Sequence, residues 1–398
     1  MKELSKVAME VVASPTIAVD TLAKQMKADG KDVISFGTGE PDFDTPDNIK
    51  EAGIRATQEG KTKYSPATGL LPLRKAISAR LLEDCGLSYE PGQIVVTSGA
   101  KHCIYLAFQA VINPGDEVVL PAPYWCSYYE LIKMAGGVPV CVYGGPGQDF
   151  KITSQDLRGA ITEKTKLFVI NNPSNPTGML YSKAELQALC DICVQHDLYI
   201  LTDEIYYHLV YEGEFVSVAA LGEEIKARTI LINGVSKSYA MTGWRIGYAA
   251  AAHPQIIKIM SNYVSNSTGG PNTMAQWAAI EALAGDQSSV YKMKAAFQER
   301  RDYICKRAEA IEGVSCLVPQ GAFYIMLNIE AFIGKTLGGK HIQNADDFAL
   351  AFLETAQVAA VSCVGFGAPN FIRMTYATSM EHITRGMDRL ESFVNNAP

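Results

Sequence analysis

The stretch TILINGVSKSYAMTGWR, residues 229–245, decides how this chain folds and where its chemistry lies. Its first four residues are β-branched or aliphatic, which is typical of a buried strand, and Gly234 ends the run. Lys237 therefore follows directly after a strand end, among small and apolar neighbours. Desolvation in such surroundings disfavours the ammonium form and lowers a lysine's pKa toward a nucleophilic amine. Arg245, a fixed cation suited to a phosphate, follows eight residues later.

Further strand-like runs lie on both sides of this stretch, and helical segments separate several of them. We expect strands at residues 94–97, 117–120, 138–142, 166–171, 198–202, 228–232 and 245–250, and helices at 100–112, 125–135 and 183–196. Alternating strands and helices predict an α/β fold, with a mostly parallel seven-stranded sheet covered by helices on both faces. Several strands end in polar or small residues, among them Gly99, Asn175 and Asp203. Because ligands bind beyond the carboxyl ends of such strands, the pattern predicts a functional site there.

The remaining sequence predicts a second, smaller domain of α+β type. Residues 274–311 have the pattern of a long helix, broken near Gly285-Asp286, and 314–328 favour strands around Pro319-Gln320-Gly321. Near the start, residues 16–29 favour a helix and 32–36 a strand. We expect a large domain at 48–290 and a discontinuous small domain formed by 1–47 and 291–398.

Composition excludes several classes of function. The chain has 398 residues, 48% of them hydrophobic, and a formal net charge of −7, which argues against a nucleic-acid-binding protein. No signal peptide or membrane-spanning run is apparent, and the nine scattered cysteines indicate reduced thiols in a cytoplasmic protein. The Cys190-x-x-Cys193 pair lies within an amphipathic pattern, and no histidine spacing completes a metal site, so we expect no metal.

An amine beside a phosphate-binding cation suits Schiff-base chemistry on pyridoxal 5′-phosphate. Taken alone, the Ser-Lys…Arg spacing is a weak signal, because a surface lysine and arginine flanking a turn would show it too. Four further segments strengthen it, at residues 37–43, 171–178, 202–206 and 371–379. In order and surroundings, all five resemble the class I aminotransferases of the fold-type-I pyridoxal-phosphate superfamily. The resemblance covers residues 4–394, and the KYSPATG run at 63–69 resembles the bacterial aspartate aminotransferase branch.

The resemblance implies roles for the residues at the strand ends. Lys237 would be the catalytic residue, bound to the cofactor as a Schiff base and later carrying the substrate proton. Asp203 would hold the pyridine nitrogen protonated; an aspartate after a strand also suits a helix N-cap, but within this set of motifs the catalytic role is favoured. Tyr206 and Asn175 would donate to the phenolic oxygen of the cofactor. By itself the Asn175 segment is also a good turn signal.

The phosphate of the cofactor would lie at a strand-to-helix junction formed by Gly99, Ala100 and Lys101, where free N–H groups favour an anion. Ser236 and Arg245 would complete this pocket. Related enzymes often carry a serine where this chain has Gly234, so one hydroxyl contact is expected to be missing.

Further contacts to the cofactor are implied from an aromatic residue and from a second subunit. Trp125 would stack on the pyridine ring, although a core tryptophan is the competing interpretation. Tyr64 and Thr268 resemble residues that reach the neighbouring subunit's phosphate, which implies a homodimer with shared active sites.

Substrate recognition follows from the same resemblance. Arg373 would clamp the α-carboxylate in a bidentate pair, assisted by the backbone of Gly39, while Asn175 and Trp125 would also line the substrate site. Lys101 would meet the distal carboxylate of an acidic substrate, and Thr16 would close over the same end. Where relatives usually carry Pro-Gly, this chain has Ser362-Cys363, so closure and specificity could differ here.

We therefore expect a pyridoxal-phosphate aminotransferase that moves an amino group between aspartate or glutamate and a 2-oxo acid by a ping-pong mechanism. Prephenate or aromatic substrates are the main competitors, and a lyase on the same fold is a second possibility. A transcription regulator with an aminotransferase-like domain is disfavoured because there is no helix-turn-helix extension. A nucleotide-binding protein is disfavoured because the chain lacks a phosphate-binding G-x-x-x-x-G-K-[ST] loop.

Overall fold

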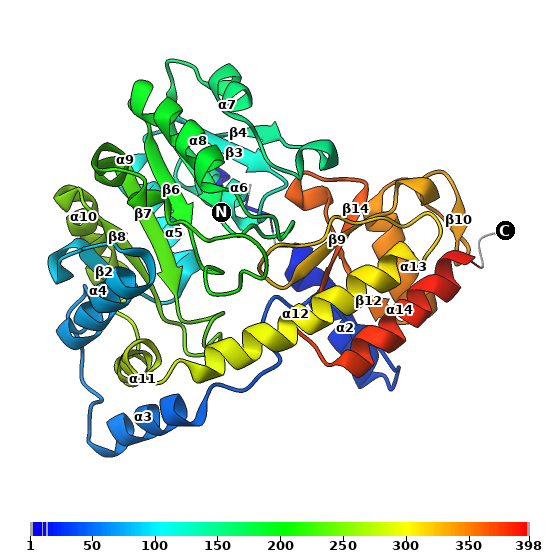
Figure 1. Ribbon diagram of the computed structural model, residues 1–398, viewed down its shortest axis with the longest axis horizontal. Helices are drawn as coiled ribbons and strands as arrows, with labels where there is room; N and C mark the ends of the chain where they lie inside the picture. Colours follow the sequence, from blue (N-terminus) through cyan, green and yellow to red (C-terminus); the bar gives the residue numbers. More distant parts are fainter. Residues whose placement is uncertain (1–2, 10, 13–14, 396–398) are drawn as a thin grey trace.

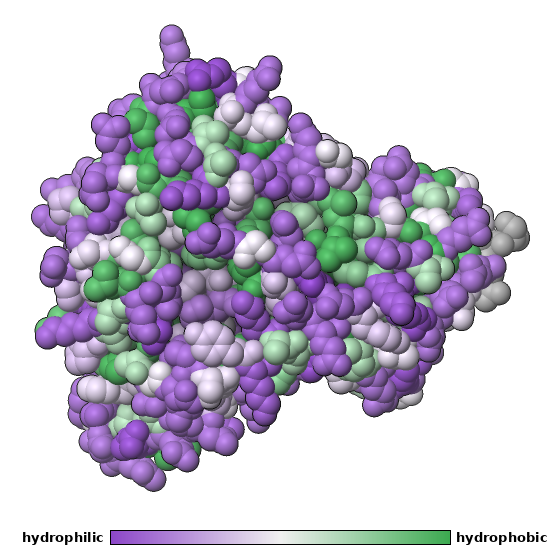
Figure 2. Space-filling model, in the orientation of Figure 1, coloured by the Kyte–Doolittle hydropathy of each residue, from purple (hydrophilic) through white to green (hydrophobic). Residues whose placement is uncertain are grey.

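A computed structural model describes residues 3–9, 11–12 and 15–395. A large part built around one sheet and a second part to its side are joined by the long helix α12 (Ser288–Glu309), as Figure 1 shows. Polar side chains cover most of the face in Figure 2, with hydrophobic residues in scattered patches between them. None of the helices in the described residues combines the length and apolarity that a membrane span needs.

The central sheet has seven strands in the order β2-β8-β7-β6-β5-β3-β4. In chain order they are β2 (Ile94–Thr97), β3 (Glu117–Ala122), β4 (Val138–Tyr143), β5 (Thr165–Asn171), β6 (Tyr199–Asp203), β7 (Thr229–Gly234) and β8 (Gly247–Ala251). Pairs from β4 to β7 are parallel, whereas β8 is antiparallel to both β2 and β7. The predicted mostly parallel seven-stranded α/β sheet is confirmed. Strand β8 begins two residues later than expected, because Arg245 has a φ of 57°, which a strand does not accommodate.

Helices cover both faces of this sheet because alternate strand residues point to opposite sides. Ile230 packs in a buried cluster with α5 (Ala100–Val111), α6 (Ser127–Met134) and α10 (Pro254–Ser267). The next residue, Leu231, packs with α4 (Leu71–Cys85) and α11 (Thr273–Ala284) on the other face. Burying one such side chain stabilises the fold by about 1.5–3 kcal/mol. A third cluster places α8 (Lys183–Gln195) against β5 and β6.

The second part contains a three-stranded antiparallel sheet in the order β13-β14-β9. Its strands are β9 (Tyr324–Asn328), β13 (Val361–Ser362) and β14 (Phe371–Thr375), and helices α2 (Pro15–Ala28), α13 (Ala345–Ala356) and α14 (Met380–Asn395) lie in the same part. Strand β1 (Ile34–Ser35) pairs in parallel with β12 (Val358–Ala359), so a segment near the start of the chain and one in its last fifty residues form one small sheet here. The division into 48–290 and 1–47 with 291–398 stays a prediction.

Two predictions about this second part have different outcomes. The expected break near Gly285-Asp286 is confirmed, because α11 ends at Ala284 and α12 begins at Ser288. Of the strands expected on either side of Pro319-Gln320-Gly321, the one after this turn is confirmed as β9, whereas the residues before it form only an isolated bridge, at Ser315. Pro319 has no N–H to donate to a ladder, and a Cβ at Gly321 would lie 2.7 Å from Pro173.

The remaining elements are short or peripheral. They are α1 (Lys6–Met9), α3 (Asp47–Gln58), α7 (Ser154–Ala160), α9 (Glu223–Arg228), β10 (Thr336–Leu337), β11 (Lys340–His341) and five 3₁₀ turns at Pro91–Gln93, Pro146–Gln148, Val218–Ala220, Glu330–Phe332 and Val364–Phe366.

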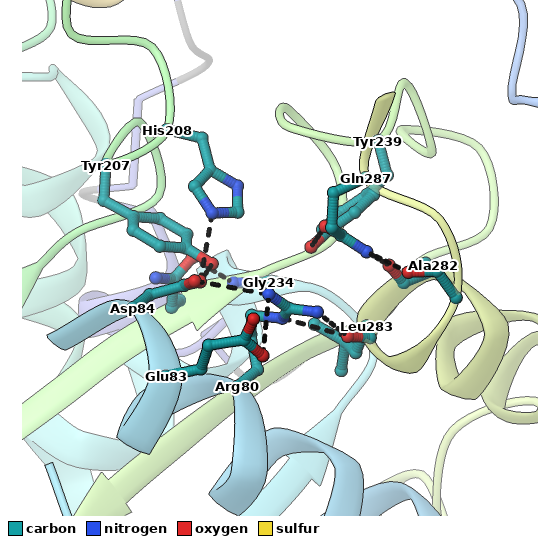
Figure 3. Close-up of polar contacts among 12 residues, drawn as sticks. Arg80, Glu83, Asp84, Tyr207, His208, Gly234, Tyr239, Ala282, Leu283 and Gln287 are labelled. Atoms are coloured by element: carbon teal, nitrogen blue, oxygen red, sulfur yellow. Dashed lines mark hydrogen bonds and ion pairs between the residues drawn. The ribbon is translucent and has the colours of Figure 1, made fainter. Parts of the chain in front are cut away.

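A polar group that we call the Asp84 cluster (Arg80, Asp84, Tyr207 and His208) fastens α4 to the turn after β6 (Figure 3). The Asp84 carboxylate accepts a hydrogen bond of 2.9 Å from the Tyr207 hydroxyl and lies 3.0 Å from His208 Nε2 and 3.3 Å from Arg80 Nη1. Arg80 also donates two hydrogen bonds, of 2.9 and 2.6 Å, to the main-chain carbonyl of Leu283 at the end of α11. The cluster therefore ties three elements of the large part together.

Candidate active site

A cavity of about 330 Å³ lies at the carboxyl ends of the central strands, between the two parts of the molecule. The predicted site residues that line it are Gly39, Ala100, Lys101, Trp125, Asn175, Asp203, Tyr206, Ser236, Lys237, Arg245 and Arg373. Arg373 comes from β14 and Gly39 from the segment after β1, whereas most of the others follow strands of the large sheet. The fold thus brings residues that are distant in sequence to one place.

Lys237 Nζ donates a hydrogen bond to the main-chain carbonyl of Gly39 and lies 5.6 Å from the centre of the Phe323 ring. Enclosure by protein lowers the pKa of Lys237 to about 8, and the positive charges of Arg373 and Arg245 act in the same direction. The carboxylates of Glu40 and Asp203 act against this lowering, but neither forms an ion pair with Lys237 within the part of the chain that the structure describes. Roughly a tenth of this lysine is therefore a neutral, nucleophilic amine at pH 7, far more than for an ordinary lysine.

Asp203 is the last residue of β6, and it is buried and lines the cavity. Burial raises the pKa of Asp203 to about 6. Two hydrogen bonds lower this pKa but do not cancel the effect of burial, one of 2.7 Å from the Tyr128 hydroxyl and one of 3.2 Å from the Ile205 N–H. No helix begins at this position, and the residues after Asp203 form turns, so Asp203 is not a helix N-cap. The strand end instead directs a carboxylate into the cavity.

Arg373 is almost completely buried, and two of its nitrogens have partners. Nη1 donates to Asn175 Oδ1 and Nη2 to the main-chain carbonyl of Gly37, each at 3.0 Å. Its Nε has no partner among the described residues. The guanidinium lies 4.3 Å from the centre of the Tyr324 ring, and the Tyr324 hydroxyl is 3.0 Å from that of Tyr206. An orphaned buried donor at a cavity wall is suited to binding an anionic ligand.

An anion cradle lies at the start of helix α5. Gly99 caps this helix with a φ of 93°, and a Cβ there would meet Arg245 Nη2 at 2.4 Å, so only glycine lets the guanidinium approach. The N–H groups of Ala100 and Lys101 have no acceptor within the helix, as at any helix start. Ser236 lines the same cavity. A Cβ at Gly234 would lie 2.9 Å from the Ile246 carbonyl, so a serine would fit poorly here.

Lys101 and Trp125 form the other wall of the cavity. The Lys101 Nζ lies 4.8 Å from the centre of the Trp125 ring, and burial lowers the pKa of this lysine. Trp125 is partly exposed to the cavity and packs edge-on against Tyr128, with ring centres 5.3 Å apart. The tryptophan is therefore available to a flat ligand, which a fully enclosed core residue would not be.

Two predicted residues, Tyr64 and Thr268, do not line this cavity, and Gly99 contributes only through the space that it leaves for Arg245. Tyr64 is fully exposed, and together with Thr268 it lines a separate surface depression. A role for these two in a neighbouring subunit's site stays a prediction. Thr16 belongs to α2, but its side chain lies outside the described residues.

Sequence reasoning did not find Tyr128 and Tyr324, two buried tyrosines of the cavity wall. Tyr128 could have been suspected from its place one helical turn after Trp125. Tyr324 carries no such signal, because its contact with Arg373 depends on the pairing of β9 with β14. Asn171, Glu40 and Thr242 also line the cavity, and the Thr242 hydroxyl donates to Glu40 at 2.8 Å.

The set of side chains fits pyridoxal phosphate. An amine of lowered pKa, a buried carboxylate, a partly exposed aromatic ring and an anion cradle with an arginine are found together at the same cavity. Among the described residues no group of three or more histidine, cysteine or acidic side chains could hold a metal ion.

Comparisons with known proteins agree with this geometry. Residues 31–390 match the family model described as "Aminotransferase class I and II". The chain is 47% identical to an aspartate aminotransferase of Bacillus sp. (strain YM-2), covering 99% of this chain and 100% of the relative. It is 45% identical to an aspartate/prephenate aminotransferase of Cereibacter sphaeroides, covering 99% of both. The solved structure of an aspartate aminotransferase from Thermus thermophilus with maleate has a TM-score of 0.93 at 39% identity, covering 99% of this chain and 100% of that one.

Proposed function

Because this chain belongs to the class I and II aminotransferases, we propose that the cavity around Lys237 is the active site of a pyridoxal-phosphate-dependent aspartate aminotransferase. Family membership establishes the fold-type-I architecture, the cofactor and the transfer of amino groups between aspartate and 2-oxo acids. One observation carries the assignment of the site. The only amine of strongly lowered pKa in the described residues, that of Lys237, shares one cavity with a buried carboxylate and a buried arginine.

Pyridoxal phosphate, attached to the lysine as a Schiff base, supplies an electron sink for the charge left when the substrate Cα–H bond breaks. Asp203 would pair with the ring nitrogen of the cofactor and keep it protonated, because an ionised carboxylate favours the protonated base. The Tyr128 hydrogen bond of 2.7 Å favours that ionised form against the effect of burial. Asn175 and Tyr206 would donate to the phenolic oxygen, and the start of α5 with Ser236 and Arg245 would bind the phosphate.

Arg373 binds and orients the substrate α-carboxylate. Its guanidinium is already aimed by Asn175 and Gly37, and its position over the Tyr324 ring fixes its plane. A guanidinium held in this way loses little freedom on binding a carboxylate in a two-pronged pair. Once the substrate amine has taken its place in the Schiff base, Lys237 Nζ would be free to accept the substrate Cα proton and to deliver it to the cofactor carbon to which the lysine had been linked. A pKa of about 8 suits both directions of this transfer near neutral pH.

Lys101 is the residue that would select acidic substrates. It lines the cavity beside Trp125 without a carboxylate partner in the described part of the chain, so it can pair with a second carboxylate of the substrate. Relatives named aspartate aminotransferase and a neighbour solved with the dicarboxylate maleate support this assignment. The relative named aspartate/prephenate aminotransferase keeps prephenate as the alternative acceptor.

A homodimer with shared active sites is part of the proposal. Tyr64 is fully exposed and lies with Thr268 beside a depression of its own, apart from the cavity of the same chain. An exposed tyrosine next to glycines is suited to insertion into another subunit. Sedimentation of the protein with and without Tyr64→Ala would show whether the contact forms a dimer.

Borohydride reduction of the cofactor-loaded protein tests the site directly. We expect the reduced protein to gain one covalently attached cofactor on the peptide that contains Lys237, and Lys237→Ala to gain none and to lose transamination to a trace. General base loss alone costs roughly 10²–10⁴-fold, and here the covalent link is lost as well. Lys101→Ala is the matched control, which should still be labelled at Lys237. Label on another lysine would contradict the assignment.

A further inference from the structure

We propose that Tyr324 is a positioning residue that donates a hydrogen bond to the Tyr206 hydroxyl and so strengthens Tyr206 as a donor to the cofactor's phenolic oxygen. The inference rests on the proposed function, because that function places Tyr206 beside this oxygen. Tyr324 itself would act through Tyr206, on the cofactor's electron distribution.

The two tyrosines are buried side by side at the wall of the cavity. Their hydroxyl oxygens are 3.0 Å apart, and their rings meet edge to face with centres 5.8 Å apart. Tyr324 is the first residue of β9, where it pairs with Thr375 of β14, so the sheet holds its backbone in place. Tyr206 lies in the turn that follows Asp203. The contact therefore joins the second part of the molecule to the catalytic turn of the large part.

The surroundings of Tyr324 leave its hydroxyl little freedom. A Cβ at Gly39 would lie 2.6 Å from the Tyr324 oxygen, so the glycine makes room for the hydroxyl and closes the opposite side. The Arg373 guanidinium lies over the ring at 4.3 Å from its centre, a contact that favours the flat stacked position. Tyr324 is thus held between Gly39, Arg373 and Tyr206.

Proton counting sets the direction of the hydrogen bond. Burial raises the pKa of both phenols, so both keep their protons near neutral pH. Each hydroxyl has one proton to donate. When Tyr206 donates its proton to the phenolic oxygen, it can only accept from Tyr324. A hydroxyl that accepts a hydrogen bond becomes a better donor, by roughly 10–30% in condensed-phase estimates.

The pKa of the Lys237 Schiff base is the property that this chain of two hydrogen bonds controls. A donor to the phenolic oxygen stabilises its negative charge, which then holds the proton of the neighbouring imine nitrogen less tightly. Stronger donation therefore lowers the Schiff-base pKa, and weaker donation raises it. Removing the Tyr324 hydroxyl should raise this pKa in the same direction as removing the Tyr206 hydroxyl, but by less.

The test is a pH titration of the visible absorption of four cofactor-loaded proteins: wild type, Tyr206→Phe, Tyr324→Phe and the double variant. We expect Tyr206→Phe to raise the Schiff-base pKa by roughly 1, as for loss of one charge-assisted hydrogen bond. Tyr324→Phe should raise it by about 0.3, the cooperative fraction of that effect. The double variant should match Tyr206→Phe alone, because phenylalanine keeps the ring that stacks on Arg373 and the Tyr324 hydroxyl acts on the cofactor only through Tyr206.

Two further variants separate this role from general packing. Tyr376→Phe removes another fully buried hydroxyl of the same hydrophobic cluster, outside the cavity, and should leave the pKa unchanged. Gly39→Ala pushes on the Tyr324 hydroxyl without removing it and should raise the pKa as Tyr324→Phe does. This second variant also serves if Tyr324→Phe fails to retain the cofactor.

The outcomes distinguish the inference from the function on which it rests. A raised pKa in Tyr206→Phe with an unchanged one in both Tyr324→Phe and Gly39→Ala would overturn the relay while the proposed active site stands. Additive rises in the double variant would also overturn it, since they would mean an independent path from Tyr324. An unchanged pKa in Tyr206→Phe would overturn the placement of Tyr206, and the inference with it.

Discussion

Two aspartates of this protein have opposite environments, and the contrast separates a structural polar cluster from a reactive one. Asp84 is surrounded by donors in the Asp84 cluster (Figure 3). Burial alone would raise the pKa of Asp84, but contacts with His208, Tyr207 and Arg80 hold this pKa below its ordinary value. Asp203 is more deeply buried and has fewer donors, and its pKa rises to about 6. The ionised Asp84 therefore stabilises the folded chain, whereas the ionised Asp203 destabilises it.

The basic residues show the same difference. Arg80 donates hydrogen bonds to the main-chain carbonyl of Leu283 and forms ion pairs of 3.3 Å with the carboxylates of Asp84 and Glu83. Arg373 keeps an unpartnered Nε, and Lys237 is bound only to a carbonyl oxygen among the described residues. Satisfied charges hold elements together, whereas charges left short of partners at a cavity are prepared for a ligand. Three predictions sharpen this comparison, in order of expected size.

Asp203→Asn should produce the largest effect, in opposite directions for activity and stability. Loss of the charge facing the cofactor should lower kcat by roughly 10²–10³-fold, the usual cost of removing one preorganised electrostatic partner. At pH 8 the free energy of unfolding of the cofactor-free variant should exceed that of cofactor-free wild type by on the order of 2 kcal/mol, because the substitution removes a buried charge. Steady-state kinetics and urea unfolding at equal protein concentration measure both.

The pH dependence gives the sign of this effect. Since the folded-state pKa of Asp203 is raised to about 6, its ionised form destabilises the fold above that pH. The cost is relieved as the pH falls through about 6 toward the unfolded value of roughly 3.9. The stability difference between wild type and Asp203→Asn should therefore be present at pH 8 and absent near pH 4. A variant that is less stable than wild type at pH 8 would contradict the comparison.

Asp84→Asn should act on stability and spare the chemistry. Its folded-state pKa is lowered, so it stabilises the fold above its unfolded value and loses that contribution as the pH falls through the folded value. We expect a loss of about 1 kcal/mol at pH 7 from the weakened contacts with Tyr207, His208 and Arg80, because solvent screens part of the charge on this partly exposed carboxylate. Activity per folded molecule should stay within about twofold. A large fall in kcat with unchanged unfolding would make Asp84 part of the active site.

Lys101→Ala should have the smallest and most selective effect. Without its charge, the KM for aspartate and glutamate should rise roughly tenfold, as for one partly desolvated charge pair, with little change for phenylalanine. Lys166→Ala is a matched control, because Lys166 is already paired with Asp116 at 2.9 Å. This substitution should leave the KM unchanged for every substrate. Equal losses across acidic and aromatic substrates would instead indicate a structural or phosphate-binding role for Lys101.

The sequence predicted the sheet and most of the residues that line the cavity because both depend on local signals. Strand β7 with Gly234 and Lys237, and strand β6 with Asp203, combine hydrophobic runs with the residues that follow them directly. The residues before Pro319 were mistaken for a regular strand, although they form only a bridge at Ser315, because Pro319 and a close backbone approach at Gly321 interrupt the ladder there.

Other features of the site depend on contacts that no local pattern contains. Tyr324 reaches Arg373 and Tyr206 only through the pairing of β9 with β14 and the packing of the two parts. The pKa of Asp203 depends on Tyr128, which lies 75 residues away in the chain. Tyr64 and Thr268 would need a second subunit, so their role is tested by assembly rather than by the single chain.

The most direct test of the central claim is the visible spectrum of the purified, cofactor-loaded protein during titration with single amino acids. Aspartate and glutamate should bleach the band to that of the amino form of the cofactor, phenylalanine should do so more weakly, and 2-oxoglutarate or oxaloacetate should restore it. Restoration by prephenate faster than by oxaloacetate would shift the physiological acceptor to prephenate. A protein that takes up no pyridoxal phosphate, or a band that aspartate leaves unchanged, would contradict the account.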